Sequence, residues 1–199
     1  MHLGLFGRFR PFTGRGQDPR LTTRWRLTTP EGGFDLSGPT QCRVISQTDV
    51  DQVRARLGPD PLSESDELQR FKKKLSKTRR SVAAVLMDQS VIAGVGNIYR
   101  SELLWFTRID PFKAANTLDD DQQTLLWSTA RRWMRIGVDT NRIITTIPAG
   151  EKVPSRMTKA ERVSIYKKDV CPECQNPVII DEIAQRKLYF CEQCQADRA

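Results

Sequence analysis

The chain has 199 residues, of which 38% are hydrophobic and 28% charged, a balance that is typical of a soluble globular protein. The sequence shows neither an apolar run long enough to cross a bilayer nor a targeting segment, which argues against a membrane protein. Lys and Arg total 32 against 24 acidic residues, a formal net charge of +8. A surplus of that size favours a polyanionic partner such as nucleic acid, although a solvated basic surface would produce the same surplus.

Residues 1–57 are predicted to form short strands and turns. The alternation of polar and apolar residues is clearest over Arg24–Thr28, and Gly32-Gly33 follows as a candidate hairpin turn. Residues 42–45 are a further candidate strand, in which Cys42 is expected to be a small buried apolar residue. This segment contains few apolar residues and opens within a strand-like stretch, so it is expected to be part of a larger domain.

The middle of the chain has a helical pattern. The segment Leu57–Leu62 contains two prolines and a glycine and is predicted to be a linker. From Ser65 to about Gly137 the pattern is helical, with one helix expected over residues 81–89. The basic run Lys72–Arg80 is expected to be a solvated face that contributes salt-sensitive affinity for a polyanion.

A long helix is expected to begin near Thr117, because Thr117-x-x-Asp120 resembles a capping box. Four apolar side chains then share one face of that helix and are expected to lie in the core: Leu126, Ala130, Trp133 and Met134. Residues 138–165 are predicted to be irregular, and residues 176–190 to form a β-hairpin.

A glycine turn precedes the helix that is expected to start at Asn97. Gly94 and Gly96 permit backbone conformations closed to other residues and let a ligand approach the main chain. Asn97 is a favourable N-cap, and the unpaired N–H groups of the first turn would suit a phosphate. Spacing alone favours the alternative of an ordinary turn between two packed helices, because short glycine motifs give many false positives.

Two Cys-x-x-Cys pairs near the C-terminus have the spacing of a four-thiolate zinc site: Cys171, Cys174, Cys191 and Cys194. The alternatives are two disulfides or four unligated thiols, and disulfides are disfavoured because no secretory signal is visible. Four thiolates would complete the coordination of one Zn²⁺ and leave no position for water, so the ion is predicted to be structural.

Four motifs, in this order, make the chain resemble the family of formamidopyrimidine-DNA glycosylase and endonuclease VIII (Fpg/Nei), nearest to its Nei-type members. His2–Gly7 is similar to the end of a hairpin in the N-terminal domain, and Leu57–Leu62 to the segment between the domains. Residues 88–99 resemble the helix–two-turn–helix signature, and the cysteine pairs resemble the family's zinc finger.

The resemblance implies an α+β fold with a partial β-sandwich over residues 1–57, a helix–two-turn–helix domain over 58–155 and a zinc-finger hairpin over 165–199. It also implies base-excision repair of oxidised bases in double-stranded DNA, by cutting the glycosidic bond and then the backbone at the abasic site. A monomer in the cytoplasm, associated with the nucleoid, is expected.

The resemblance also assigns roles to individual residues. Asn97, with Gly96, would bind a phosphate beside the lesion, and Arg56 would contact DNA. Arg186, near the hairpin tip, would hold phosphate and assist the elimination step as a catalytic residue. Leu5 and Phe6 would fill the gap left by the flipped base, although both could instead be sandwich core.

The chain departs from the family at its start. Family members begin Pro-Glu after the initiator Met, and the proline amine is the nucleophile. This sequence begins Met1-His2-Leu3, so we expect an N-terminally truncated member that is inactive as written. The alternatives are a non-catalytic, zinc-dependent module that binds damaged DNA and a zinc-ribbon adaptor for protein interactions.

Overall fold

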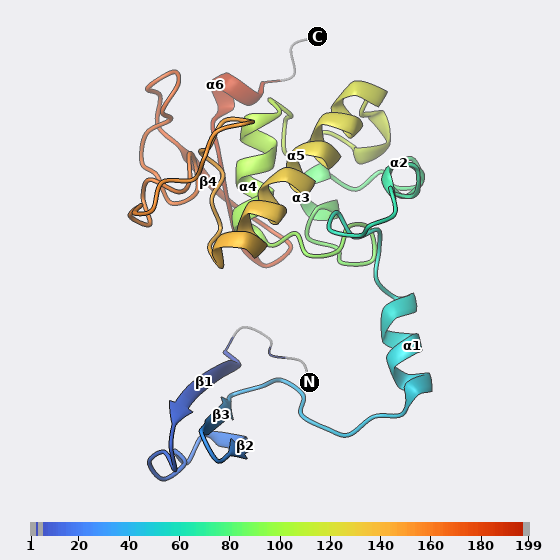
Figure 1. The fold of residues 1–199 in the computed structure, drawn as a ribbon. Coiled ribbons are helices and arrows are strands. Elements are labelled where there is room, and N and C mark those ends of the chain that lie inside the picture. Colours follow the sequence, from blue (N-terminus) through green and yellow to red (C-terminus); the bar gives the residue numbers. More distant parts are fainter. Residues whose placement is uncertain (1–2, 4–5, 197–199) are drawn as a thin grey trace. The chain divides into compact units, whose positions relative to one another are not determined.

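The computed structural model describes Leu3 and residues 6–196, and the chain divides into two compact units, Met1–Gln52 and Val53–Ala199 (Figure 1). Each unit is described by itself. Among the described residues, no helix is both long enough and apolar enough to span a membrane.

The first unit contains a three-stranded antiparallel sheet in the order β1-β3-β2. Its strands are β1 (Arg8–Thr13), β2 (Thr23–Thr29) and β3 (Gly32–Ser37). Because β2 ends at Thr29 and β3 begins at Gly32, the hairpin turn lies at residues 30–31, two positions earlier than predicted, and Gly32-Gly33 belong to the strand. A side chain at Gly33 would place its Cβ 2.0 Å from the carbonyl oxygen of Leu27, so glycine permits the close approach of the strands here.

The predicted strand over residues 42–45 is wrong: it does not form, and helix α1 (Gln47–Ala55) follows instead. Ser46 starts this helix by reciprocal capping, since the Asp49 backbone N–H donates to Ser46 Oγ at 3.2 Å and the Ser46 N–H donates to Asp49 Oδ2 at 3.0 Å. The buried position expected for Cys42 is also wrong, because its side chain is exposed.

The second unit has a helical core. Its helical elements are α2 (Leu68–Leu75), α3 (Val82–Val85), α4 (Asn97–Phe106), a 3₁₀ turn η1 (Ala115–Thr117) and α5 (Asp120–Thr140). The predicted start of the long helix at Thr117 is two residues early. Asp119 is the N-cap and forms a capping box with Gln122. The predicted core face of α5 is confirmed, since all its members are buried: Leu126, Ala130, Trp133 and Met134.

The helix predicted over residues 81–89 is limited to α3, because the chain turns after Leu86 toward α4. The turn is closed by Gln89, whose side chain donates to the Val95 carbonyl at 2.8 Å and accepts from the Gly94 N–H at 2.8 Å. Gly58, in the segment predicted to be a linker, is buried and donates its N–H to the Gln89 carbonyl at 2.8 Å. That segment therefore packs against the turn before α4.

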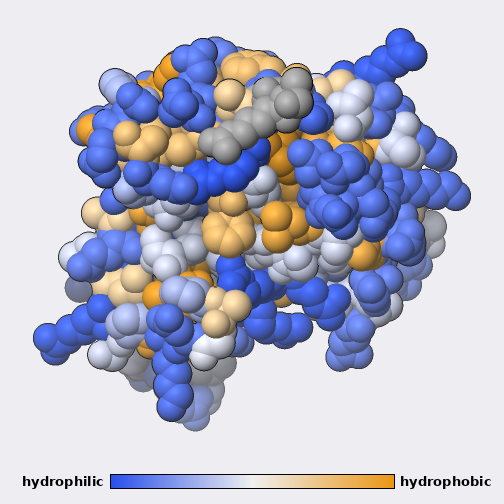
Figure 2. All heavy atoms as spheres, turned by 90° about the horizontal axis from the view of Figure 1, so that it is seen from above, coloured by the Kyte–Doolittle hydropathy of each residue, from blue (hydrophilic) through white to orange (hydrophobic). Residues whose placement is uncertain are grey.

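The C-terminal part of the second unit contains the hairpin expected over residues 176–190, formed by β4 (Ile179–Ile183) and β5 (Arg186–Phe190), and then the short helix α6 (Glu192–Gln195). Residues 141–170 contain no named helix or strand. Leu188 and Phe190 on β5 pack into the helical core. On the face drawn in Figure 2, hydrophilic residues predominate and apolar residues lie in separate patches between them.

Candidate metal centre and nucleic-acid interface

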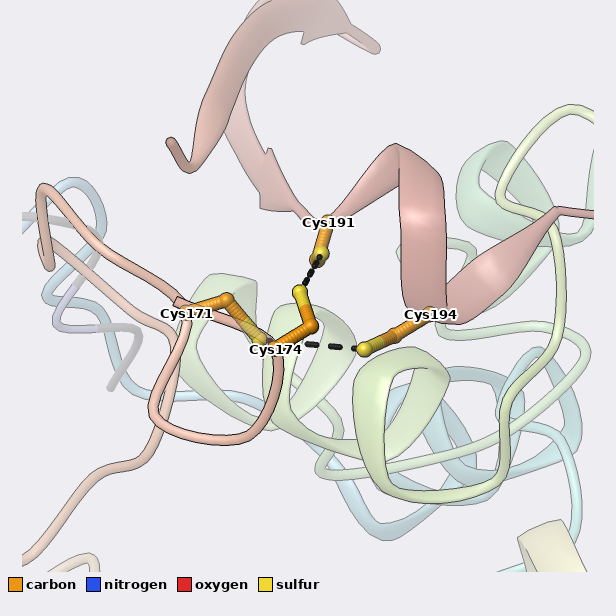
Figure 3. A group of neighbouring side chains, drawn as sticks. All are labelled: Cys171, Cys174, Cys191 and Cys194. Carbon is orange, nitrogen blue, oxygen red and sulfur yellow. Dashed lines mark hydrogen bonds between the residues drawn. The ribbon is translucent and has the colours of Figure 1, made fainter. Parts of the chain in front are cut away.

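The four cysteines of the two pairs come together at one point. Their sulfur atoms lie within 4.8 Å of one another, and Figure 3 shows the side chains converging from the loop before β4 and from the start of α6. The distance from Cys171 Sγ to Cys194 Sγ is 3.8 Å, and that from Cys174 Sγ to Cys191 Sγ is 3.3 Å. Tetrahedral Zn²⁺ with Zn–S bonds of about 2.3 Å separates its sulfurs by about 3.8 Å, so the arrangement fits this ion.

The protonation chemistry of the thiols also suits a cation. A hydrogen bond from the Asn176 backbone lowers the pKa of Cys174 to about 6, whereas burial and the neighbouring sulfurs raise the pKa of Cys194 to about 12. Burial likewise raises the pKa of Cys191, so Cys191 and Cys194 resist ionisation without a cation, and a divalent ion would stabilise their thiolates. This set of donors is that of a closed structural zinc site, which holds the hairpin and α6 together.

The end of α4 supports the first cysteine pair. The Trp105 indole Nε1–H donates to Cys171 Sγ at 3.4 Å. The Arg108 guanidinium lies 5.1 Å from the centre of the Trp105 ring and forms an ion pair with Glu173, which stands between Cys171 and Cys174. Donors to ligating sulfurs orient the ligands and adjust their basicity, so α4 and the metal centre are physically coupled.

The start of α4 carries Gly96 and Asn97. Gly96, not Asn97, is the N-cap, and Asn97 is the first helical residue, which corrects the expected capping role. A Cβ built at Gly96 would meet nothing within 4 Å, so the backbone here is open to a ligand. Asn97 Nδ2 donates to the Lys187 carbonyl at 2.8 Å, which places Asn97 against the β4–β5 hairpin. The helix start and the hairpin therefore form one continuous surface.

Arg186 is the first residue of β5 and is exposed, directly after the two-residue turn Ala184-Gln185. Its neighbour Lys187 is the residue that accepts from Asn97. Burial and, next, the charge of Arg186 lower the pKa of the buried Arg100 to about 10. The exposed Arg186 and Lys187 and the half-buried amide of Asn97 thus lie where α4 begins.

The remaining candidates lie elsewhere. Arg56 is exposed, and its side chain makes no hydrogen bond or ion pair with any residue the structure describes. Phe6 is 80% exposed in the first unit. Leu5 lies outside the described residues. Within the basic run, Lys72 pairs with Asp120 at 2.5 Å.

Sequence reasoning missed Arg100 and Glu102, which are both fully buried on α4. Glu102 Oε1 accepts the backbone N–H groups of Ile165 at 2.8 Å and Tyr166 at 2.7 Å. Its Oε2 accepts the Ser164 N–H at 2.7 Å and the Thr145 hydroxyl at 2.6 Å. The carboxylate thereby ties the segment that leads into the zinc finger to α4. The signal available in the sequence was a pair of charged residues, three and five positions after Asn97, on an otherwise apolar helix.

Comparison with known proteins agrees with this arrangement. The family model described as "Formamidopyrimidine-DNA glycosylase H2TH domain" matches residues 57–149. Endonuclease 8 1 of Mycobacterium tuberculosis is 35% identical over 202 residues, which cover 98% of this chain and 75% of that protein. Formamidopyrimidine-DNA glycosylase of Herpetosiphon aurantiacus is 30% identical over 184 residues, covering 92% of this chain and 61% of that protein.

Solved structures share the fold. Lactococcus lactis Fpg in a complex with an abasic site containing DNA superposes with a TM-score of 0.77 at 22% identity, covering 98% of this chain and 74% of that one. MutM in complex with carbocyclic 8-oxo-G containing DNA superposes with a TM-score of 0.80 at 24% identity, covering 98% and 73%. The fold and the four-cysteine site define a DNA-repair glycosylase architecture with a structural zinc finger.

The chain belongs to the Fpg/Nei family, whose members are DNA glycosylases and abasic-site lyases. The resemblance drawn from its motifs, the α+β fold class and the structural zinc are thereby confirmed.

Proposed function

We propose that the chain binds damaged double-stranded DNA through a surface made of the start of α4 and the β4–β5 hairpin. The proposal rests on the 2.8 Å hydrogen bond from Asn97 Nδ2 to the Lys187 carbonyl, which joins residues 90 positions apart in the chain. It brings together an amide donor, an open glycine backbone and the exposed Arg186, groups that would contact neighbouring phosphates of one strand. Arginine can donate two parallel hydrogen bonds to a phosphate, and helix starts attract anions.

The charge and the relatives support this proposal. A net charge of +8 favours a polyanion, and the structural neighbours include glycosylases crystallised with abasic and 8-oxo-guanine DNA. We assign Gly96 and Asn97 to phosphate binding beside the lesion, and Arg56 to a further contact with DNA. Arg186 would hold phosphate and assist elimination. Its exposure leaves the guanidinium available for that role.

Oxidised bases are the proposed lesions, and an apolar wedge would replace the stacking of the flipped base. Phe6 is exposed as such a wedge requires, and Leu5 is assigned to the same loop. The domain ranges that we propose are 1–57 for the sandwich portion, 58–155 for the helix–two-turn–helix domain and 165–199 for the zinc finger. We further propose a monomer that associates with the nucleoid.

For a polypeptide of these 199 residues we propose binding without catalysis. Each of the 11 prolines in these residues follows another residue, so its nitrogen is an amide and not the secondary amine that forms the Schiff base in the family. We therefore propose that this polypeptide is a non-catalytic module that recognises damaged DNA. Glycosylase and lyase activity is the function proposed for its family fold.

The test combines binding and covalent trapping. Fluorescence anisotropy would compare the affinity of the 199-residue polypeptide for a duplex with a single tetrahydrofuran abasic analogue and for the undamaged duplex. Tighter binding to the analogue, weakened by Asn97→Ala and by Arg186→Ala, is expected. Incubation with a natural abasic site and borohydride should give no cross-link. Equal affinity for both duplexes would refute lesion recognition, and a strong cross-link would refute the proposed inactivity.

A further inference from the structure

Arg100 is a charged residue in a buried position, where a charge is costly unless other groups compensate for it. It is 0% exposed, three residues after Asn97 on the same face of α4. Its guanidinium contacts the hairpin rather than an acidic partner: Nη1 donates to the Ile183 carbonyl at 2.9 Å, and Nη2 to the Arg186 carbonyl at 3.1 Å. Nη2 also lies 3.3 Å from the Lys187 carbonyl.

The same guanidinium sets the orientation of Asn97. Arg100 Nη2 donates to Asn97 Oδ1 at 2.5 Å. Because this bond holds the amide oxygen, the amide nitrogen of Asn97 faces the hairpin. The amide nitrogen then has one hydrogen directed to the Lys187 carbonyl at 2.8 Å. Its second hydrogen has no partner among the described residues, and it is the donor available to a phosphate.

The turn that Arg100 holds is one that its sequence does not favour. Ala184 and Gln185 both have left-handed backbones, with φ of 55° and 57°. A two-residue turn with both φ values positive usually carries Asn-Gly, because other side chains are strained there. The carbonyls on either side of the turn, at Ile183 and Arg186, are the ones that Arg100 binds. The buried guanidinium thus compensates for a turn sequence that does not specify its own shape.

We infer that Arg100 is the positioning residue of the proposed DNA-binding surface: it holds the β4–β5 turn against the start of α4 and so sets Arg186 and Asn97 at the spacing of one DNA strand. The inference rests on the proposed function. Burial and the charge of Arg186 lower the pKa of Arg100 to about 10, so the guanidinium remains protonated at neutral pH and can serve in this role.

The first experiment measures binding of the full chain to the tetrahydrofuran duplex by anisotropy. Arg100→Met keeps an apolar stem of similar length and removes every donor, and we expect it to weaken binding by about tenfold or more. The slope of log Kd against log salt should fall by about one, because Arg186 no longer meets its phosphate. Arg70→Met is the matched control, since Arg70 is an exposed arginine paired with Glu67, and its affinity should equal that of the wild type.

A double-mutant cycle separates positioning from general stability. In an Arg186→Ala background, Arg100→Met should weaken binding clearly less than in the wild type, because one of the two groups that it positions is already gone. An equal loss in both backgrounds would overturn the inference. If the wild type binds and Arg186→Ala weakens it while Arg100→Met does not, the inference fails and the proposed function survives. If the wild type does not distinguish damaged DNA, both fail.

Two further variants cover the case in which Arg100→Met does not fold. Arg100→Lys retains the charge but cannot span the carbonyls and Asn97 at once, so it should fold and bind with intermediate affinity. Adding Ala184→Asn and Gln185→Gly to Arg100→Met gives a turn that adopts the left-handed shape unaided, and should restore part of the binding. Failure of this rescue in a folded protein, or unfolding of both Arg100 variants, would assign Arg100 to the core and overturn the inference.

Discussion

Replacing Glu102 with glutamine tests how the zinc-finger segment is fastened to α4. The carboxylate is fully buried and accepts four hydrogen bonds of 2.6 to 2.8 Å. Glutamine keeps one carbonyl oxygen, which can still accept from Ile165 and Tyr166. Its NH₂ group, however, faces the Ser164 N–H, so a buried donor is left without an acceptor. The Thr145 hydroxyl can rotate and accept from the new NH₂.

The magnitude follows from these contacts. An unsatisfied buried N–H costs about 1–3 kcal/mol, and replacing a charged acceptor by a neutral one weakens each of the two remaining bonds by about 1 kcal/mol. The relief from burying a charge offsets part of this sum. We therefore expect Glu102→Gln to lower the free energy of unfolding by about 3 kcal/mol, which corresponds to a fall in Tm of about 6–12 °C for a unit of this size.

The assay is thermal unfolding of the zinc-loaded protein, combined with hydrogen exchange of the amides at residues 164–166. Those amides should exchange faster in Glu102→Gln. Glu151→Gln, an exposed glutamate in the same unit, is the control and should unfold at the wild-type temperature. Unchanged Tm together with unchanged protection at residues 164–166 would show that the four contacts do not contribute to stability as argued.

Four further outcomes are expected. Trp105→Phe removes the indole donor to Cys171 and should speed zinc release to a chelator by about tenfold, as followed with a zinc-sensitive dye; release at the wild-type rate would contradict the coupling of α4 to the metal centre. Zinc removal should abolish protection of the amides at residues 179–190 while helical circular dichroism persists, because an isolated hairpin is marginal in water; retained protection would argue against a structural ion. Gly58→Ala should destabilise by about 2 kcal/mol in urea unfolding, since its Cβ would lie 2.6 Å from a backbone carbon atom in the turn before α4. Gly96→Ala, with open space around its Cβ but at the N-cap of α4, where alanine is less favourable than glycine, should cost less stability than Gly58→Ala and should weaken DNA binding. The reverse pattern would refute the assignment of the two glycines.

The sequence by itself determined the parts of this protein that rest on local spacing. Paired thiols three residues apart specify a metal knuckle whatever surrounds them, so the zinc site follows from the order of the residues alone. The apolar stripe of α5 and the hairpin between the cysteine pairs follow in the same way from periods of 3.6 and 2. Even the missed helix α1 had a local signal, the reciprocal cap of Ser46 and Asp49.

Only the tertiary structure decided how distant segments meet. A buried arginine or glutamate looks like a surface charge in a sequence, because the groups that satisfy it lie elsewhere in the chain. The partners of Arg100 include backbone carbonyls 83 to 87 positions away, and those of Glu102 include N–H groups 62 to 64 positions away. Backbone groups are present at every residue and carry no signature of their own, so only the folded chain reveals which of them receive these side chains.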